Sequence, residues 1–577
     1  MLNRFVSRPD FDSYEDFYNN FSVNIPDNFN FAYDVMDELA KIRGGDQALV
    51  WCDEDGAEAV FTYGEIKKLS DQAANVLHDA GFRKGDPVML ILKRRWQYWP
   101  IVLALHKIGA VGIPATHLLT TKDIVYRCQA ADVAGIICVD DEQILRKVDE
   151  AEIKLKKDSK GETSFLRYKA FVRSAHTPPD LDVAARAAQG KTAEASIPWA
   201  DFSGLQQKAS ANFARIPQVN TNDDIMLLYF TSGTTGMPKM VRHNFAYPLG
   251  HIVTAKYWLR VEDGGLHLTV AETGWAKAAW GKLYGQWLCG SAIFVYDFDR
   301  FVPAAMLEII SKYRVTSFCA PPTIYRFFIK EKLSKYDFSA LKYCSVAGEP
   351  LNPEIYEQFL EATGIKLREC YGQTELTVTL CTYPWLEPKP GSMGKPSPGY
   401  DIDLLRDDGS SCDMGEEGQI VVRTDKRQPA GIFGGYYRDE ELTQTVWHDG
   451  IYYTGDMAWR DEDGYYWFVG RADDVIKSSG YRIGPFEVES ALLEHPSVLE
   501  CAVTGVPDPD RGTIVKATVV LAKGWIPSEG LKQELQNHVK KTTAPYKYPR
   551  IVDFVTELPK TISGKIRRVQ IREEDVR

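Results

Sequence analysis

A stretch rich in hydroxyl groups and glycine follows directly after the apolar run Ile225 to Phe230. Glycine lets a backbone approach a polyphosphate closely, and backbone N–H groups and Ser or Thr hydroxyls can donate to its oxygens. A lysine at the end of the stretch adds a compact positive charge. We therefore expect a cradle for a nucleoside triphosphate, formed by Thr231, Ser232, Gly233, Thr234, Thr235, Gly236 and Lys239.

The spacing of this stretch argues against the best-known phosphate loop. A P-loop has the pattern G-x-x-x-x-G-K-[ST], with its lysine directly after the second glycine. Here Met237 and Pro238 intervene, and no Ser or Thr follows Lys239. Walker-type NTPases and kinases therefore fit poorly, and an ordinary polar loop is the alternative interpretation.

Length and composition indicate a globular protein of two or more domains. The chain has 577 residues, of which 44% are apolar and 25% charged, and this is too long for a single core. Its formal net charge of −11 gives no electrostatic footprint for nucleic acid, and no run of 18 apolar residues is present to span a bilayer. We expect a soluble protein with no nucleic-acid partner and no membrane span.

Two further features predict a cytoplasmic protein with reduced thiols. The N-terminus carries acids from Asp10 onward and lacks an apolar segment of signal-peptide length, so neither secretion nor organelle import is predicted. Ten cysteines are scattered without a C-x-x-C pair, which favours buried free thiols over a disulfide framework or a zinc site.

Apolar runs alternate with helical patterns up to about residue 400, which predicts an α/β protein with parallel layers. In one unit, Tyr343 to Val346 reads as a buried strand and Ala347 to Pro350 as a loop. A helix then begins at Pro353, after an Asn352 cap, and ends at Gly364. A loop at the carboxyl end of such a strand is a usual place for a ligand.

The pattern changes twice along the chain. Short strands and Gly/Asp turns predict a small β-rich subdomain over about residues 400–472, which completes an N-terminal domain of residues 1–472. Strand and helix patterns then alternate again, which predicts a compact α+β domain over residues 473–577. The charged tract Lys154 to Thr163, with Ser174 to Asp182 after it, is expected to be an exposed excursion.

Further motifs follow the phosphate stretch in a fixed order: Gly348-Glu349-Pro350, Tyr371-Gly372-Gln373-Thr374-Glu375, Tyr452 to Asp456, Gly470 to Asp474, and Pro559 to Lys565. Together these strings resemble the adenylate-forming superfamily of AMP-binding enzymes, and most closely its medium-chain acyl-CoA synthetases. The resemblance spans about residues 30 to 570. It implies a large N-terminal domain of layered α/β subdomains with a β-rich subdomain, followed by a mobile α+β C-terminal domain.

The resemblance implies which residues would bind ATP and its metal ion. Tyr371 would stack on the adenine, Asp456 would accept the ribose hydroxyls, and Glu375 would hold Mg²⁺, a hard cation that takes carboxylate oxygens. Lys565 would be the catalytic lysine at the α-phosphate, and Asp473 the hinge. The implied ATP-binding residues beyond the cradle are Gly348, Glu349, Pro350, Tyr371, Gly372, Gln373, Thr374, Asp456, Arg471 and Lys565.

Such a family member joins a carboxylate to ATP, releases pyrophosphate, and passes the acyl group from AMP to a second acceptor. Positioning and charge neutralisation suffice for the first step, and no protein nucleophile is needed. The segment Lys477 to Pro485 favours CoA as the acceptor. The expected CoA-binding residues are Ser479, Gly480, Tyr481, Arg482, Arg511, Lys540, Tyr548 and Arg550.

The acyl pocket is expected at Gly274, Trp275, Trp280 and Gly372. In acetyl-CoA synthetases a tryptophan before Gln-Thr-Glu closes this pocket, whereas here the residue is Gly372. We therefore expect a deeper pocket and poor use of acetate. Glu272 stands where the family has Asp, and Lys277 is expected to face either the substrate or solvent.

Two alternatives remain open at the level of sequence. One is an adenylating enzyme that transfers the acyl group to a carrier-protein phosphopantetheine, and the other is a nucleotide-binding sensor without catalysis. Medium straight chains, branched chains and aromatic acids all remain possible substrates. The oligomeric state and regulation by lysine acylation cannot be derived from the sequence.

Overall fold

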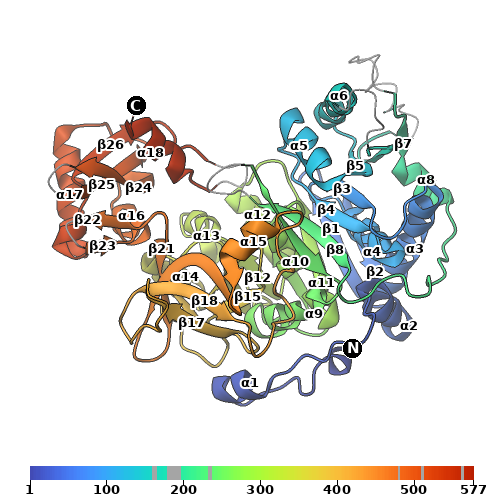
Figure 1. The fold of residues 1–577 in the computed structure, drawn as a ribbon, viewed down its shortest axis with the longest axis horizontal. Coiled ribbons are helices and arrows are strands. Elements are labelled where there is room, and N and C mark those ends of the chain that lie inside the picture. Colours follow the sequence, from blue (N-terminus) through green and yellow to red (C-terminus); the bar gives the residue numbers. More distant parts are fainter. Residues whose placement is uncertain are drawn as a thin grey trace.

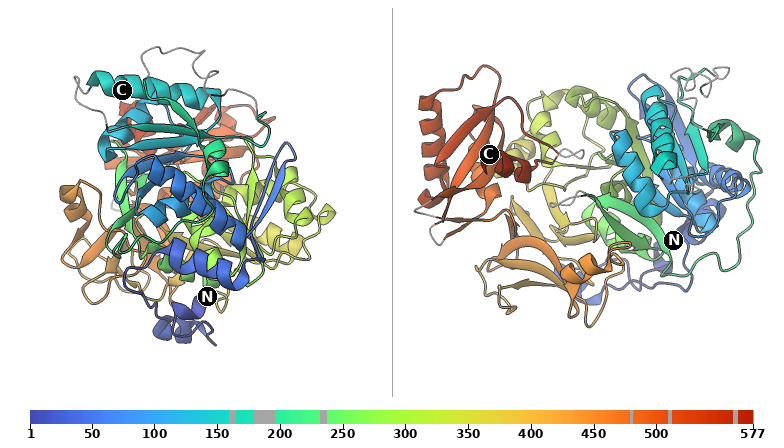
Figure 2. Two further views of the ribbon diagram at one scale, coloured as in Figure 1. Left: turned by 90° about the vertical axis from the view of Figure 1, so that its right-hand side faces the viewer. Right: turned by 45° about the horizontal axis from the view of Figure 1, so that its top comes forward.

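The computed structural model describes residues 1–158, 165–178, 183, 196–231, 237–478, 481–508, 512–560 and 565–576. A large body carries the N-terminus, and the C-terminal domain lies at one side of it (Figure 1). The two further views show the same separation (Figure 2). Among the described residues, no helix is long and apolar enough to cross a membrane.

The first layer of the body is a seven-stranded sheet in the order β7-β6-β5-β3-β4-β8-β9. Its strands run parallel except for the β8–β9 hairpin, which is antiparallel. The strands are β3 (Pro87–Ile91), β4 (Val111–Pro114), β5 (Gly135–Val139), β6 (Tyr168–Val172), β7 (Trp199–Asp201), β8 (Ile225–Thr231) and β9 (Lys239–Asn244). The helices next to them in sequence are α3 (Tyr63–Asp79), α4 (Tyr98–Ile108), α5 (Thr121–Ala131), α6 (Glu142–Asp158) and α8 (Phe202–Lys208).

The second layer begins as a parallel sheet, with only its edge strand β2 antiparallel. Its strands are β1 (Gln47–Asp53), β2 (Glu58–Thr62), β10 (Leu266–Thr269), β11 (Ala292–Asp297), β12 (Ser317–Ala320), β13 (Tyr343–Val346) and β14 (Leu367–Gly372). The helical segments of this part are α9 (Tyr247–Ile252), η3 (Val253–Trp258), α10 (Ala276–Lys282), α11 (Tyr284–Leu288), α12 (Pro303–Lys312), α13 (Pro322–Phe328), η4 (Leu333–Lys335) and α14 (Pro353–Thr363).

The same sheet continues from β14 into antiparallel strands, which form the β-rich part of the body. These are β15 (Val378–Cys381), β16 (Ser392–Pro396), β17 (Asp401–Leu405), β18 (Gly418–Arg423), β19 (Trp447–His448), β20 (Ile451–Arg460) and β21 (Tyr466–Arg471), with the short helix α15 (Glu440–Val446). At the N-terminus lie η1 (Leu2–Arg4), α1 (Tyr14–Asn20), η2 (Ala32–Asp37) and α2 (Glu38–Arg43).

The C-terminal domain has its own core around Val488, Val503, Leu535 and Val539. A three-stranded sheet in the order β24-β25-β26 packs against helices, and the hairpin β22–β23 joins it to the body. Its elements are β22 (Ile476–Ser478), β23 (Tyr481–Ile483), α16 (Pro485–Leu493), β24 (Val498–Asp508), β25 (Gly512–Leu521), α17 (Glu529–Thr542), η5 (Pro545–Lys547), β26 (Ile551–Val555) and α18 (Arg568–Val576).

The unit predicted around residue 350 matches the structure closely. The Asn352 side chain accepts from the Glu354 N–H at 2.8 Å, so it caps α14, and Gly364 ends the helix at φ 71°. The prediction of an exposed excursion was wrong for the first part of the tract. Lys154 to Asp158 form the last turn of α6, where Leu155 is 7% exposed because it packs against the core. Residues 159–164 and 179–182 of that prediction lie outside the described residues.

Candidate active site

The phosphate stretch joins the two strands of the β8–β9 hairpin. Thr231, the last residue of β8, pairs with Lys239, the first residue of β9. The Lys239 ammonium lies 5.1 Å from the centre of the Tyr436 ring. Ser232, Gly233, Thr234, Thr235 and Gly236 lie outside the described residues.

Tyr436 links this hairpin to the predicted magnesium ligand. Its hydroxyl donates to Oε1 of Glu375 at 2.9 Å. Burial, followed by the negative charge of Glu375, raises the pKa of the Tyr436 hydroxyl, which therefore stays protonated and can donate. The predicted phosphate lysine and the predicted metal ligand thus share one tyrosine, whose part in the site was not predicted.

The second cluster surrounds Asp456, which lies on β20 and is 5% exposed. Its Oδ2 accepts from the Tyr371 hydroxyl and from Nε2 of Gln373, each at 2.6 Å. The Arg471 guanidinium stands 3.6 Å from Oδ1. Burial raises the pKa of the Asp456 carboxyl, and Arg471 offsets part of that effect. Tyr452, which was not predicted, donates to Oε1 of Gln373 at 2.9 Å and fixes the amide orientation.

Lys565 comes to this cluster from the other domain. It precedes α18, next to a bridge between Lys560 and Ile566. Burial raises the pKa of the Asp456 carboxyl, and the positive charge of Lys565 offsets a small part of that effect. The terminal domain thus contributes a positive charge to the electrostatics of this cluster.

The loop after β13 carries the next group of predicted residues. Gly348 has φ 107°, a conformation that favours glycine. Glu349 is exposed and accepts from the Thr323 hydroxyl at 2.9 Å, while Pro350 is half-buried. The Lys277 ammonium donates to the Ala347 carbonyl at 2.7 Å, so it braces this loop instead of facing solvent.

Glu369 anchors the far end of that loop and was not predicted. Its two carboxylate oxygens accept from the backbone N–H groups of Leu351 and Gly391, each at 2.8 Å. Complete burial outweighs these two hydrogen bonds and raises the pKa of the carboxyl to about 8.

The acyl side brings two of the predicted pocket residues together. A Cβ atom on Gly372 would lie 2.4 Å from the Trp280 ring and 2.3 Å from the Thr377 carbonyl oxygen. The Trp280 indole of α10 therefore lies directly beside Gly372. The depth of the acyl pocket stays a prediction, with Trp280 as part of its wall.

The segment before α10 is held by close packing. A Cβ atom on Gly274 would lie 2.4 Å from the backbone of Ala115 and Thr116. Glu272 is buried and accepts from the Thr116 hydroxyl at 2.7 Å and from the His117 backbone N–H at 3.1 Å. The longer acid at position 272 thus fits the site, and the half-buried Trp275 lies directly before α10 without capping it through its side chain.

The predicted CoA-binding residues form two separate groups. Lys540 and Arg550 both lie over the Tyr548 ring, at 4.0 and 4.9 Å, and Arg550 also donates to the Tyr548 hydroxyl at 2.7 Å. Tyr481 stacks instead on Tyr546, with ring centres 4.1 Å apart. Ser479, Gly480 and Arg511 lie outside the described residues.

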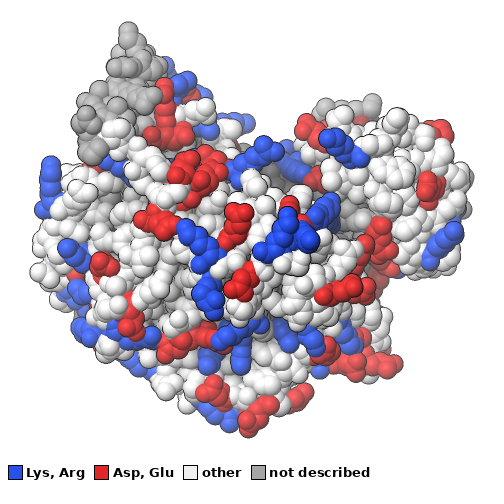
Figure 3. Space-filling view, turned by 180° about the vertical axis from the view of Figure 1, so that it is seen from behind, with Lys and Arg blue, Asp and Glu red and all other residues white. Residues whose placement is uncertain are grey.

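Arg482 belongs to neither group, because it forms a 2.7 Å ion pair with Asp407 of the body. The predicted hinge, Asp473, lies in the turn between β21 and β22, 3.6 Å from Nε of Arg471. In the space-filling view, Lys and Arg side chains gather where the terminal lobe meets the body (Figure 3). A margin rich in positive charge attracts anions.

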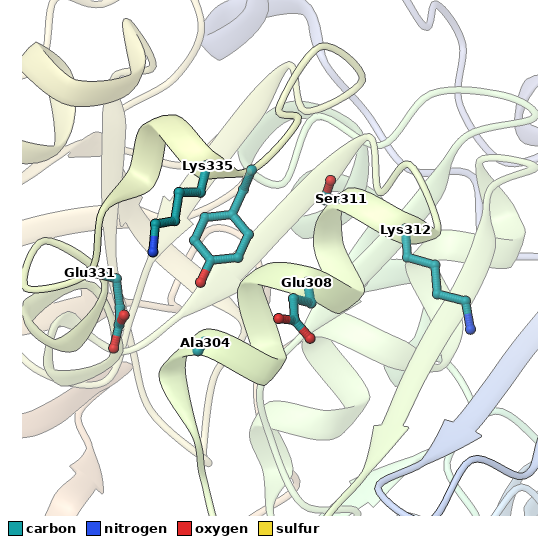
Figure 4. Close-up of a pocket in the computed structure, with 7 residues that line it drawn as sticks. Ala304, Glu308, Ser311, Lys312, Glu331 and Lys335 are labelled. Carbon is teal, nitrogen blue, oxygen red and sulfur yellow. The ribbon is translucent and has the colours of Figure 1, made fainter.

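A separate surface pocket of about 610 Å³ lies between α12 and η4 and contains none of the predicted site residues. Figure 4 shows Glu331 and Lys335 on one side of it and Glu308 on α12. Its lining consists mainly of charged and polar side chains, with Tyr336 as the one aromatic residue among those that line it.

Comparisons with known proteins define the class. The family model of the AMP-binding enzymes matches residues 36–437, and the model of their C-terminal domain matches residues 487–565. The chain belongs to the AMP-binding enzyme family. The predicted layered α/β fold is confirmed.

The more particular likeness is to acyl-coenzyme A synthetases. The mitochondrial protein ACSM3 of Mus musculus is 40% identical over 582 residues, covering 99% of this chain and 95% of that protein. Human ACSM4, also named mitochondrial, is 40% identical, and the match covers 96% of this chain and 92% of that protein. The predicted class, an ATP-dependent acyl-CoA synthetase, is confirmed by these matches.

Solved structures agree with this class. An anthranilate CoA ligase in complex with anthranoyl-AMP has a TM-score of 0.81 at 27% identity and covers 96% of this chain and 98% of its own. A benzoate CoA ligase from Burkholderia xenovorans has a TM-score of 0.77 at 27% identity. The match covers 94% of this chain and 100% of that ligase.

The predicted cytoplasmic location is contradicted by these comparisons. The relatives described above are named mitochondrial, which points to the mitochondrion and away from the cytoplasm. The prediction rested on the charge pattern of the first residues. In the structure that segment packs into the core through Phe5 and Phe17, so its composition serves folding and is a poor guide to location.

Proposed function

We propose that the chain activates a carboxylic acid with ATP at the Asp456 cluster and transfers the acyl group to CoA. The observation that carries this proposal is the buried Asp456 carboxylate, to which Tyr371 and Gln373 donate and which Arg471 approaches. A nucleotide whose ribose is held by Asp456 would receive Lys565 from the terminal domain at its α-phosphate. A sensor that only binds nucleotide has no need of a second domain that supplies such a lysine.

In the first half-reaction a carboxylate oxygen attacks the α-phosphorus of ATP, and the bond to the β-phosphate breaks. Lys565 would neutralise the charge that develops at the α-phosphate, while Thr231 and Lys239 steady the departing pyrophosphate. Tyr371 and the loop of Gly348, Glu349 and Pro350 would hold the adenine. The products of this step are acyl-AMP and pyrophosphate.

Glu375 is suited to hold Mg²⁺. It is a half-buried carboxylate whose Oε1 is fixed by Tyr436, and carboxylate oxygen is the ligand type that Mg²⁺ takes. Within the described residues, no group of three or more His, Cys, Asp or Glu side chains could hold a metal without further ligands, so triphosphate oxygens and water would complete the set. When bound, the ion would supply positive charge against the triphosphate.

In the second half-reaction the CoA thiol attacks the acyl carbonyl, and AMP leaves. The terminal domain must rotate about Asp473 for this step, because Arg482 is paired with Asp407 in the present arrangement. Rotation would free Arg482 for a phosphate of CoA, and the Lys540, Tyr548 and Arg550 group would bind its nucleotide. A carrier-protein phosphopantetheine would not need the latter group.

For the acid we propose a compact acyl group of about four to eight carbons, aromatic acids included. Each methylene buried against the Trp280 wall would add about 0.8 kcal/mol until the pocket is full. The likeness to anthranilate and benzoate CoA ligases supports a place for a ring.

The test is pyrophosphate release from ATP and Mg²⁺ with acids from acetate to decanoate, together with benzoate, with and without CoA. We expect turnover that requires both an acid and CoA. Acid-dependent release indifferent to CoA would favour a carrier-protein acceptor, and the absence of acid-dependent release would contradict the proposal.

A further inference from the structure

Trp280 and four other aromatic or histidine side chains form a buried group, which we call the polar aromatic cluster. They come from four elements of the chain, and each is at most 7% exposed. Its members are Tyr229 on β8, His243 on β9, Tyr247 and His251 on α9, and Trp280 on α10.

The rings of the cluster pack directly on one another. The centre of the Tyr247 ring lies 3.8 Å from that of His243 and 4.6 Å from that of His251. Tyr229 lies 6.1 Å from His243, and Trp280 lies 6.3 Å from His251. Burial raises the pKa of the Tyr247 hydroxyl, and the nearby Trp280 N–H offsets part of that rise, although the two atoms do not meet hydrogen-bond geometry.

Every member of the cluster has a buried polar atom without a hydrogen-bond partner in the described part of the chain. These atoms are Oη of Tyr229 and of Tyr247, Nδ1 of His243, Nε2 of His251 and Nε1 of Trp280. An unpaired buried polar atom costs about 1–3 kcal/mol, and folded proteins rarely tolerate several in one place. Such a concentration marks a binding surface for a polar group.

The cluster adjoins the proposed acyl pocket. The Trp280 ring lies against Gly372, and the Nε2 atom of His243 lies 2.7 Å from the Thr374 carbonyl oxygen in the same motif. The cluster is thus joined to the proposed pocket at two points, the Trp280 ring and the Thr374 carbonyl.

The free atoms of the cluster include both donors and acceptors. A carbonyl oxygen only accepts, so Nε2 of His243 carries the proton and Nδ1 is left as an acceptor. Burial lowers the pKa of His243 to about 4, which keeps the ring neutral and Nδ1 basic. The Trp280 N–H only donates, and a tyrosine hydroxyl can do both. A hydroxyl group, which donates and accepts at once, matches this set.

We propose that the preferred acids carry a hydroxyl group on the acyl part, which the polar aromatic cluster binds. This inference rests on the proposed acyl-CoA synthetase function. A purely apolar pocket would instead disfavour such acids, because a hydroxyl loses its hydration there without compensation.

The experiment compares matched acids in the CoA-dependent release of pyrophosphate: hexanoate with 6-hydroxyhexanoate, and benzoate with each of its three monohydroxy derivatives. We expect at least one hydroxylated acid to exceed its parent in kcat/KM by about three- to tenfold, the gain of a net hydrogen bond. If every hydroxylated acid is poorer than its parent, the inference is overturned while the synthetase function stands. If no acid supports turnover, both fail.

Two variants assign the preference to the cluster. Tyr229→Phe and Tyr247→Phe each remove one hydroxyl, and at least one should reduce the ratio of kcat/KM between hydroxylated acid and parent to near unity. The matched control is Tyr284→Phe, whose ring packs on Tyr247 at 6.2 Å but whose hydroxyl already bonds Nε2 of His106 at 3.3 Å. The ratio should not change in the control. An unchanged ratio in both cluster variants would overturn the assignment.

Discussion

Arg482 of the terminal domain and Asp407 of the β-rich part form an ion pair with a nitrogen–oxygen distance of 2.7 Å. A residue proposed for CoA is thus held by the body. Under the proposed function, this pair would favour the domain arrangement for adenylation over the one for thioester formation. Because Asp407 is 80% exposed, its contribution is expected to be below about 1 kcal/mol.

Replacing Asp407 should therefore speed the second half-reaction. In Asp407→Asn we expect single-turnover thioester formation from supplied acyl-AMP and CoA to rise by roughly twofold to fivefold, as loss of up to about 1 kcal/mol permits. Asp413→Asn is the control, because Asp413 pairs with Arg406 in the same turn and not with the terminal domain. Equal rates in both variants would show that the pair does not hold the domain.

Loss of the motif lysine should separate the two half-reactions. Lys565→Ala is expected to slow carboxylate-dependent pyrophosphate release by about a hundredfold or more, because a positive charge at the α-phosphate is lost. Thioester formation from supplied acyl-AMP should remain. Lys560→Ala is the control from the same motif, since Lys560 pairs with Glu500 at 2.8 Å. A similar loss in both half-reactions would contradict the proposed role.

Trp280 should determine which chain length of the acid substrate is preferred. In Trp280→Leu the space beside Gly372 becomes larger, and we expect the chain-length optimum to move up by about two carbons, with each methylene worth about 0.8 kcal/mol. The measurement is kcat/KM across straight-chain acids from butyrate to decanoate. Trp525→Leu, at an exposed tryptophan of the terminal domain, is the comparison. An optimum that stays in place would remove Trp280 from the pocket wall.

Glu369 should make stability depend on pH. Its carboxyl has a folded-state pKa of about 8, above the ordinary value of 4.5, so the folded protein holds this proton where the unfolded chain has lost it. Its contribution is complete below pH 4.5 and is lost as the pH rises toward about 8, with a slope of at most about 1.4 kcal/mol per pH unit.

Urea unfolding at pH 5.5 and 7.5 tests this dependence. The free energy of unfolding should fall less between these two pH values in Glu369→Gln than in the unmodified chain, because glutamine does not titrate. Glu354→Gln, at the exposed start of α14, should retain the full fall. Parallel pH profiles of the unmodified chain and Glu369→Gln would contradict the raised pKa.

The parts of the fold that the sequence predicted follow from local rules. Asn352, Pro353 and Gly364 mark the ends of one helix because capping depends on residues within a single turn. The Trp280 contact with Gly372 joins positions on different elements, and no spacing rule reveals it. The same holds for Tyr436 with Glu375 and for Arg482 with Asp407, since each pair forms only when distant segments pack together.

The register of the β8–β9 hairpin also limits how this chain can vary. Thr231 pairs with Lys239, and successive strand residues point to opposite faces of a sheet. A slip of one residue would turn the lysine away from Tyr436 and from the proposed triphosphate site. A single-residue insertion or deletion inside either strand would therefore change which face of the sheet carries Lys239, so the strand lengths constrain variation here as much as the motif residues do.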